Sequence, residues 1–155
     1  MPSTLRAEIK QTKPFESLEQ EAQLSIERTA AVLGHALAEA FKPYGITATQ
    51  YNVLRILRGA GKVGLCRNEV RDRLIAQVPD VTRLLDRLEE SGLIARQRSN
   101  PDRRLVATHI TAAGTTLLHK LDAPIAKVHK AHLGHMSGKQ LKTLVDLLAL
   151  AREAV

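Results

Sequence analysis

Residues 81–92, VTRLLDRLEESG, and residues 93–114, LIARQRSNPDRRLVATHITAAG, are the part of this sequence that decides its fold class. The first stretch repeats its apolar residues at helical spacing, so that they share one sector of roughly 120° on a helix. The second stretch changes period. Two segments rich in Leu, Ile, Val and Thr, 93–98 and 105–110, flank the turn-forming residues of 99–104 and predict a β-hairpin.

Another helix is expected just before this stretch. Residues 67–74 carry Val70 and Leu74 four positions apart, the spacing of one helical face. After a brief connection, Pro79 stands where the first residue of the next helix is expected, because proline lacks the amide hydrogen that a first helical turn leaves unpaired. We therefore predict a helix-turn-helix whose second helix runs from Pro79 to about Ser91, followed by a β-wing.

Longer helices are expected on both sides. Capping boxes at Ser17, Thr47 and Ser137, and a capping Thr111, mark helix beginnings, and Pro124 should kink the helix that Thr111 opens. The first helix has an apolar stripe about 35 Å long, more than so small a domain needs, so part of it should pack on a second subunit. Its residues are Leu18, Ile26, Ala30, Leu33, Leu37 and Phe41. The predicted class is mainly α with a small β-wing.

Composition narrows the function classes. The chain has 155 residues and a net charge of +7, which favours an acidic partner only if the cations are suitably placed. Aromatic residues make up 3% and tryptophan is absent, which argues against stacking platforms for single-stranded nucleic acid. The lone cysteine, Cys66, excludes an internal disulfide framework. No long apolar run or signal segment occurs, so we expect a cytoplasmic protein that does not enter the membrane.

The second helix of the pair is the candidate for reading double-stranded DNA, because an α-helix fits the major groove and presents its N-terminal residues to base edges. Arg83 is the candidate for a bidentate contact to guanine. Pro79, Asp80 and Thr82 at the helix start are assigned to the DNA-binding surface, with Asp80 and Thr82 as candidates for contact with base edges or phosphates. Arg87, one turn later, is a candidate for contact with phosphate. The alternative is an amphipathic helix whose exposed charges are simply solvated.

The predicted wing carries an excess of cations. Arg96, Arg98, Arg103 and Arg104 against Asp102 give a net charge of +3 within nine residues. An anionic surface should lie opposite them, and an arginine at such a tip fits a narrow minor groove. We expect Asp102 to pair with an arginine and stabilise the hairpin, since phosphate would repel a carboxylate.

These residues resemble the MarR family of winged-helix transcription regulators. The D-x-R signature of the wing matches at Asp102 and Arg104, and the T-x-x-G signature after it matches at Thr111 and Gly114. The resemblance implies an obligate homodimer with interlaced N- and C-terminal helices that binds a pseudo-palindromic operator. It also implies release by a small aromatic effector or an oxidant, with an effector pocket between the dimer helices and the DNA-binding lobe.

The expected organisation is a flexible arm over residues 1–14 and a single winged-helix domain over 15–155. Within that domain, we assign dimerisation helices to about 15–42 and 111–153, and the DNA-binding lobe to about 47–110. The predicted function is a sequence-specific DNA-binding regulator, with repression as the expected sign.

Three other functions have weaker support. A metal site is conceivable at His129, His132 and His135, although positions six apart diverge by about 120° on a helix. Cys66 beside Arg67 is a conceivable redox sensor, whereas a lone cysteine is more commonly a small packed side chain. A winged helix that binds protein is the third. We predict no metal, no cofactor and no enzymatic activity, since no catalytic constellation can be assigned.

Overall fold

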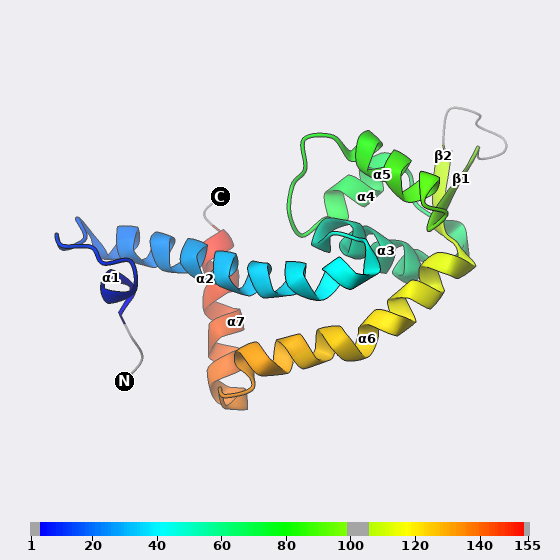
Figure 1. Ribbon diagram of the computed structural model, residues 1–155. Helices are drawn as coiled ribbons and strands as arrows, with labels where there is room; N and C mark the ends of the chain where they lie inside the picture. The colour runs from blue at the N-terminus through cyan, green and yellow to red at the C-terminus, as the bar shows by residue number, and fades with distance from the viewer. Residues whose placement is uncertain (1–3, 99–105, 154–155) are drawn as a thin grey trace. The chain divides into compact units, whose positions relative to one another are not determined.

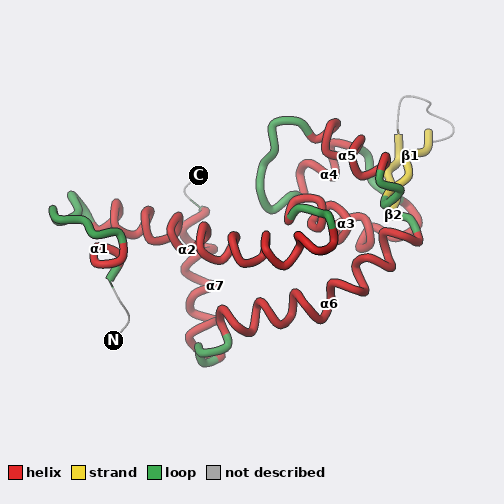
Figure 2. Tube along the Cα trace, viewed as in Figure 1, coloured by secondary structure: helices red, strands yellow, loops and turns green. Residues whose placement is uncertain are grey.

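The structure is a computed structural model that describes residues 4–98 and 106–153 (Figure 1). Its elements are α1 Leu5–Glu8, α2 Leu18–Phe41, the 3₁₀ helix η1 Lys42–Tyr44, α3 Ala48–Ala60, the 3₁₀ helix η2 Gly61–Val63, α4 Arg67–Arg73, α5 Val81–Glu90, β1 Ile94–Arg98, β2 Val106–Ile110, α6 Ala112–Leu133 and α7 Gly138–Arg152. Figure 2 shows that helices dominate and that β1 and β2 form a small sheet. The predicted class, mainly α with a small β-wing, is confirmed.

The chain divides into two compact units, Met1–Leu37 and Ala38–Val155. In the first unit, the arm that we predicted to be flexible contains the helical turn α1, with Leu5 buried and Thr4 as its N-cap. The Arg6 guanidinium donates to the carbonyl oxygens of Gln11, at 3.2 Å, and Thr12, and these bonds close the following loop. Local side-chain bonds of this kind leave no periodic pattern in the sequence, which explains why the turn was not predicted.

A hydrophobic core holds the helix-turn-helix together in the second unit. Its buried members come from α3, α4, α5, β1 and α6 and from the segment just before α4. They are Val53, Leu54, Leu57, Leu65, Val70, Val81, Leu85, Leu88, Ile94 and Leu118. Because α5 commits three apolar side chains to this core, its opposite face is held toward solvent.

Helix α3 shows why the predicted boundaries were accurate where capping is local. The Thr47 hydroxyl accepts from the Gln50 amide at 3.1 Å, and the Gln50 side-chain oxygen accepts from the Thr47 amide at 2.9 Å. The helix ends before Gly61, whose φ of 62° lies in the left-handed region that glycine adopts without steric cost. The capping box predicted here is therefore confirmed.

The two strands pair in antiparallel register, with Ile94 opposite Ile110 and Arg98 opposite Val106. Leu65 adds a bridge to the other edge of β2, since its amide and carbonyl exchange hydrogen bonds with Thr108 at 3.0 and 2.7 Å. The segment before α4 is thereby tied to the strand pair, and the wing base is fixed on the same lobe as the helix pair.

Thr111 joins the end of α5 to the start of α6. Its hydroxyl donates to the Gly92 carbonyl at 2.7 Å and accepts from the Gly114 amide at 3.1 Å. Gly114 approaches β1 so closely that a Cβ there would lie 2.3 Å from the Leu93 carbonyl oxygen. The T-x-x-G signature is therefore a tight junction between the wing base and α6.

The C-terminal helices begin as predicted, with Thr111 capping α6 and a Ser137–Gln140 capping box opening α7. Pro124 lies inside α6, which continues to Leu133. Helix α7 buries none of its side chains, and three of its large apolar residues, Val145, Leu147 and Leu150, are exposed. Among the described residues, no helix is both long enough and apolar enough to span a membrane.

Candidate nucleic-acid interface

Helix α5 starts at Val81, two residues later than predicted. Asp80 is its N-cap, and the carboxylate Oδ1 accepts from the Arg83 amide at 2.9 Å. Pro79, which we predicted as the first helical residue, lies ahead of this cap. An aspartate side chain can satisfy an otherwise unpaired amide of the first turn, and proline cannot, so Asp80 sets the boundary. Asp80, a candidate for base or phosphate contact, has a capping role in the structure.

The solvent face of α5 presents the predicted arginines. Thr82, Arg83 and Arg87 are exposed, while Leu85 and Leu88 on the other side are buried. Within residues 4–98 and 106–153, the guanidinium groups of Arg83 and Arg87 make no hydrogen bond or ion pair. Four residues apart, they lie about one turn from each other on one face. Both charges are therefore available to an anionic partner.

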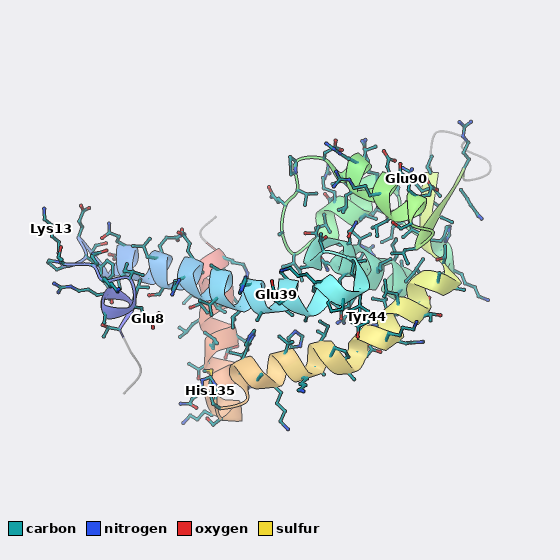
Figure 3. All side chains as sticks on the ribbon, viewed as in Figure 1. Glu8, Lys13, Glu39, Tyr44, Glu90 and His135 are labelled. Carbon is teal, nitrogen blue, oxygen red and sulfur yellow. The ribbon has the colours of Figure 1, made fainter. Side chains whose placement is uncertain are left out.

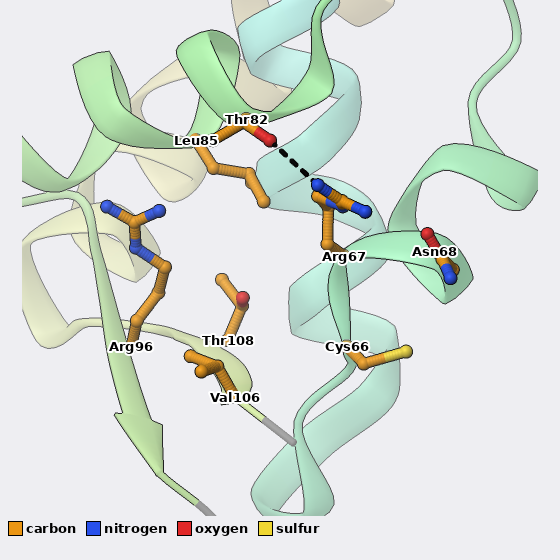
Figure 4. Close-up of a pocket in the computed structure, with 8 residues that line it drawn as sticks. All are labelled: Cys66, Arg67, Asn68, Thr82, Leu85, Arg96, Val106 and Thr108. Carbon is orange, nitrogen blue, oxygen red and sulfur yellow. Dashed lines mark hydrogen bonds between the residues drawn. The ribbon is translucent and has the colours of Figure 1, made fainter. Parts of the chain in front are cut away.

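Helix α4 adds a cation that the sequence did not single out. Arg67 Nη1 donates to the Thr82 hydroxyl at 3.2 Å, which links the first turns of α4 and α5 (Figure 4). Arg67 and Thr82 also line a shallow cavity of about 260 Å³ together with Pro79 and Asp80. Arg67 was considered only as a neighbour of Cys66, because its position opposite α5 depends on the packing of the two helices.

The carboxylates of the helix pair are largely engaged inside the lobe. Glu69 accepts from the Cys66 amide at 2.8 Å, Asp72 pairs with Arg71 at 2.9 Å, and Asp80 caps α5. Backbone bonding at Cys66 lowers the pKa of the Glu69 carboxyl, which keeps it ionised at the start of α4. Arg83 and Arg87 therefore face solvent without an ion pair to any of these three carboxylates.

Arg96, predicted to contact DNA, has a different set of partners. Its Nε and Nη2 donate to Glu89 Oε2 at 2.9 and 2.5 Å, its amide donates to Glu89 Oε1 at 3.0 Å, and Nη2 pairs with Asp86 Oδ1 at 2.7 Å. We call these three residues the Arg96 clamp. Hydrogen bonding to Arg96 lowers the pKa of Glu89, and bonding to Glu89 raises the pKa of Arg96. The contact with DNA that we predicted for Arg96 stays a prediction, and in the structure its guanidinium is already paired with these two carboxylates.

The clamp predicts a dependence of stability on pH. Because the pKa of Glu89 is depressed in the folded chain, its contribution is present above the ordinary value of 4.5 and is lost as the pH falls through the folded value. We expect Glu89→Gln to lower the free energy of unfolding by about 1 kcal/mol at pH 7. Thermal unfolding from pH 7 to pH 3 should show this difference shrinking below about pH 4.5, and a difference that stays constant would contradict the assignment.

Only part of the predicted wing lies within the described residues. Arg98 ends β1 and is exposed. Arg103, Arg104 and Asp102 lie outside the described residues, so the minor-groove and pairing roles predicted for them stay predictions. The strands that lead into and out of this segment are nevertheless in place beside α5 (Figure 1).

A side chain of α3 forms a hydrogen bond with the segment between α4 and α5. Asn52 Oδ1 accepts from the Ile75 amide at 3.0 Å, across 23 positions of sequence. A hydrogen bond between distant positions has no local signature, and only an asparagine on an otherwise amphipathic helix hinted at it. Asn52 thus ties the segment that follows α4 to α3.

Comparisons with known proteins agree with this arrangement. A family model described as the MarR family matches residues 46–106, which include α3, α4, α5 and β1. The HTH-type transcriptional regulator TtmR of Methylorubrum extorquens (strain PA1) is 32% identical over 141 residues, covering 89% of this chain and 69% of that protein. The chain belongs to the MarR family. The resemblance predicted from the wing signatures is confirmed.

Solved structures of MarR proteins share the fold. The MarR transcription factor from Planctomyces limnophilus is 39% identical with a TM-score of 0.68, and the match covers 88% of this chain and 99% of that one. A mutant MarR from E. coli complexed with operator DNA is 24% identical with a TM-score of 0.78, covering 97% and 99%. The winged helix-turn-helix of this MarR-family chain is therefore established.

The other candidate sites of this MarR-family chain fare differently. Among the residues that the structure describes, no group of three His, Cys, Asp or Glu side chains could hold a metal ion, so His129, His132 and His135 do not come together as a site. Cys66 is half-buried at the N-cap of α4. It lines a cavity of about 470 Å³ between α4, α5 and the strands, with Arg67, Thr82, Arg96 and Thr108 (Figure 4).

Proposed function

We propose that this chain is a transcriptional regulator that binds double-stranded DNA sequence-specifically, with α5 in the major groove and the wing along the neighbouring backbone. The observation that carries the proposal is that Arg83 and Arg87 are exposed on α5 and, among the described residues, have no hydrogen-bond or ion-pair partner, while the neighbouring carboxylates of Glu69 and Asp80 are engaged within the lobe. Membership of the MarR family, whose named relatives are transcriptional regulators, supports it. These relatives are not enzymes, and we propose no catalytic step here.

We propose that the functional unit is a homodimer. On α7, Leu147 and Leu150 are 58% and 62% exposed in the single chain, and Leu18 and Ile26 of α2 are also exposed. Apolar surface of this extent gains about 25 cal/mol per Å² when a partner covers it. Two copies of α5 about 34–36 Å apart would read half-sites one helical turn apart on a pseudo-palindromic operator, with repression following from occupancy. Such a regulator acts where the chromosome is, in the cytoplasm.

Arg83 and Arg87 should have separable effects. We expect Arg83→Ala to cost about 1–3 kcal/mol on the operator and much less on random duplex, because a base contact is lost. Arg87→Ala should weaken binding to both duplexes equally and reduce the salt slope by about one, since a phosphate contact is lost. Fluorescence-anisotropy titrations of the two variants on both duplexes measure these effects. Equal losses on both duplexes for Arg83→Ala would reject its assigned role.

The proposal is tested by allowing the purified chain to retain fragments of the genome that encodes it and sequencing what is recovered. We expect one or a few related sites to be enriched. Affinity for the recovered site should fall steeply between 50 and 200 mM salt, with a log–log slope of about −0.9 per neutralised phosphate. A winged helix that binds protein instead would retain no preferred fragment.

A further inference from the structure

The Arg96 clamp joins the wing to α5 at a place that matters for DNA binding. Arg96 lies on β1, whereas Glu89 and Asp86 lie one turn apart on α5. Glu89 grips both the guanidinium and the backbone amide of Arg96, at 2.9 and 3.0 Å. Because one of these bonds comes from the backbone amide, it fixes the position of the strand as well as that of the arginine side chain. These bonds fix the orientation of β1, and so of the wing base, relative to α5, the proposed reading helix.

The clamp also neutralises a cation. Arg96 lines the same cavity as Arg67 and Thr82, between α5 and the strands (Figure 4). Its side chain keeps 26% of its surface exposed, so solvent reaches it. Two carboxylates nevertheless hold it, at 2.5 and 2.7 Å, whereas Arg83 and Arg87 have no such partners among the described residues. Arg83 and Arg87 are therefore available to an anionic partner, whereas Arg96 is neutralised within the lobe.

Withholding a cation affects specificity because phosphate contacts are independent of sequence. An unpaired arginine at this position would add affinity for every duplex alike. Base contacts by α5 would then account for a smaller share of binding. A wing free to move would also lose the fixed register in which α5 meets base edges.

We propose that Glu89 and Asp86 are positioning residues for sequence-specific DNA binding: they fix the wing against α5 and keep Arg96 from contacting phosphate. This inference rests on the proposed function. It assigns the two acidic residues a part in discriminating operator from other DNA, although neither contacts DNA itself.

The test compares Glu89→Ala with Glu90→Ala in the full-length chain. The two residues are neighbours on α5, and both substitutions remove one negative charge from the same turn. Glu90, labelled in Figure 3, is exposed and has no interaction within the described residues, so it reports the charge change alone. Affinities for the recovered operator and for random duplex are measured over a range of salt concentrations.

We expect Glu89→Ala to lower the ratio of operator to random affinity roughly five- to tenfold. It should also steepen the salt slope on random duplex by up to about 0.9, the value for one added phosphate contact, because Asp86 alone is left to hold Arg96. Glu90→Ala should change the ratio less than about twofold. Arg96→Gln separates the two parts of the inference, because it removes the guanidinium bonds that join β1 to α5 without freeing a cation. It should lower the ratio and leave the salt slope unsteepened.

Several results would overturn the inference. Equal ratios for Glu89→Ala and Glu90→Ala would show that the clamp does not act on specificity. Parallel losses on both duplexes together with a lower unfolding temperature would show that it acts only on folding. Identical salt slopes for Glu89→Ala and Arg96→Gln would show that no cation is released. A wild-type chain that binds all duplexes with equal affinity would instead contradict the proposed function. This affinity comparison is made on the wild type before any variant is measured.

Discussion

Replacing Leu147 and Leu150 together by aspartate is expected to dissociate the dimer and to weaken operator binding by at least about 100-fold. Both side chains are exposed on α7 in the single chain, and the proposed partner covers them. Two linked lobes gain affinity because the second half-site is met at high effective concentration, an advantage of about 10²–10⁴ that a monomer loses. Sedimentation velocity and operator titration measure the two effects.

The control for this variant is Ala149→Asp. Ala149 is exposed on the side of α7 that carries Lys142 and Asp146, where a charge should be tolerated. It should remain dimeric with wild-type affinity for the operator. A Leu147→Asp/Leu150→Asp protein that stays dimeric, or a wild type that is monomeric at micromolar concentration, would show that α7 does not form the interface.

Gly114→Val is expected to lower the free energy of unfolding by about 3 kcal/mol or more, among the larger effects of a single substitution. A Cβ at this position would lie 2.3 Å from the Leu93 carbonyl oxygen and 2.7 Å from Ile110 Cγ1. The Leu93 backbone and the Ile110 side chain cannot both move away without opening the junction between the wing base and α6. Denaturant unfolding followed by circular dichroism measures the loss.

Gly59→Ala is the matched control. Gly59 lies inside α3 with nothing within 4 Å of its virtual Cβ. Alanine there should stabilise the chain by about 0.5–1 kcal/mol, because glycine loses more conformational freedom in a helix. Equal effects of the two substitutions would show that the close approach at Gly114 has no energetic weight.

Boundaries set by local chemistry could be predicted from the sequence. The capping boxes at Thr47 and Ser137 join residues three positions apart, and both form. The two strands were predictable because the change of period that marks them in the sequence is also local. Pro79 shows the limit of this reasoning. Both proline and the following aspartate suit a helix start, and the bond from the Arg83 amide to Asp80 decides between them.

How well the candidate residues could be placed from the sequence depends on the range of the interactions involved. Arg83 and Arg87 were placed on the solvent face by helical spacing alone. Arg96 and Arg98 look alike in sequence, two positions apart on one strand, yet only Arg96 meets Glu89 and Asp86 across the turn after α5. That distinction needs the packed arrangement of helix and strand, as does the bond between Asn52 and Ile75.

Protection of guanine N7 atoms from methylation on the recovered operator tests the central claim most directly, because N7 lies in the major groove where α5 is proposed to bind. The account predicts two protected segments with centres about 10–10.5 base pairs apart, one for each protomer. Arg83→Ala should lose this guanine protection while the backbone stays shielded from hydroxyl radicals. Unprotected guanines under a bound wild-type protein, or a single protected segment, would contradict it.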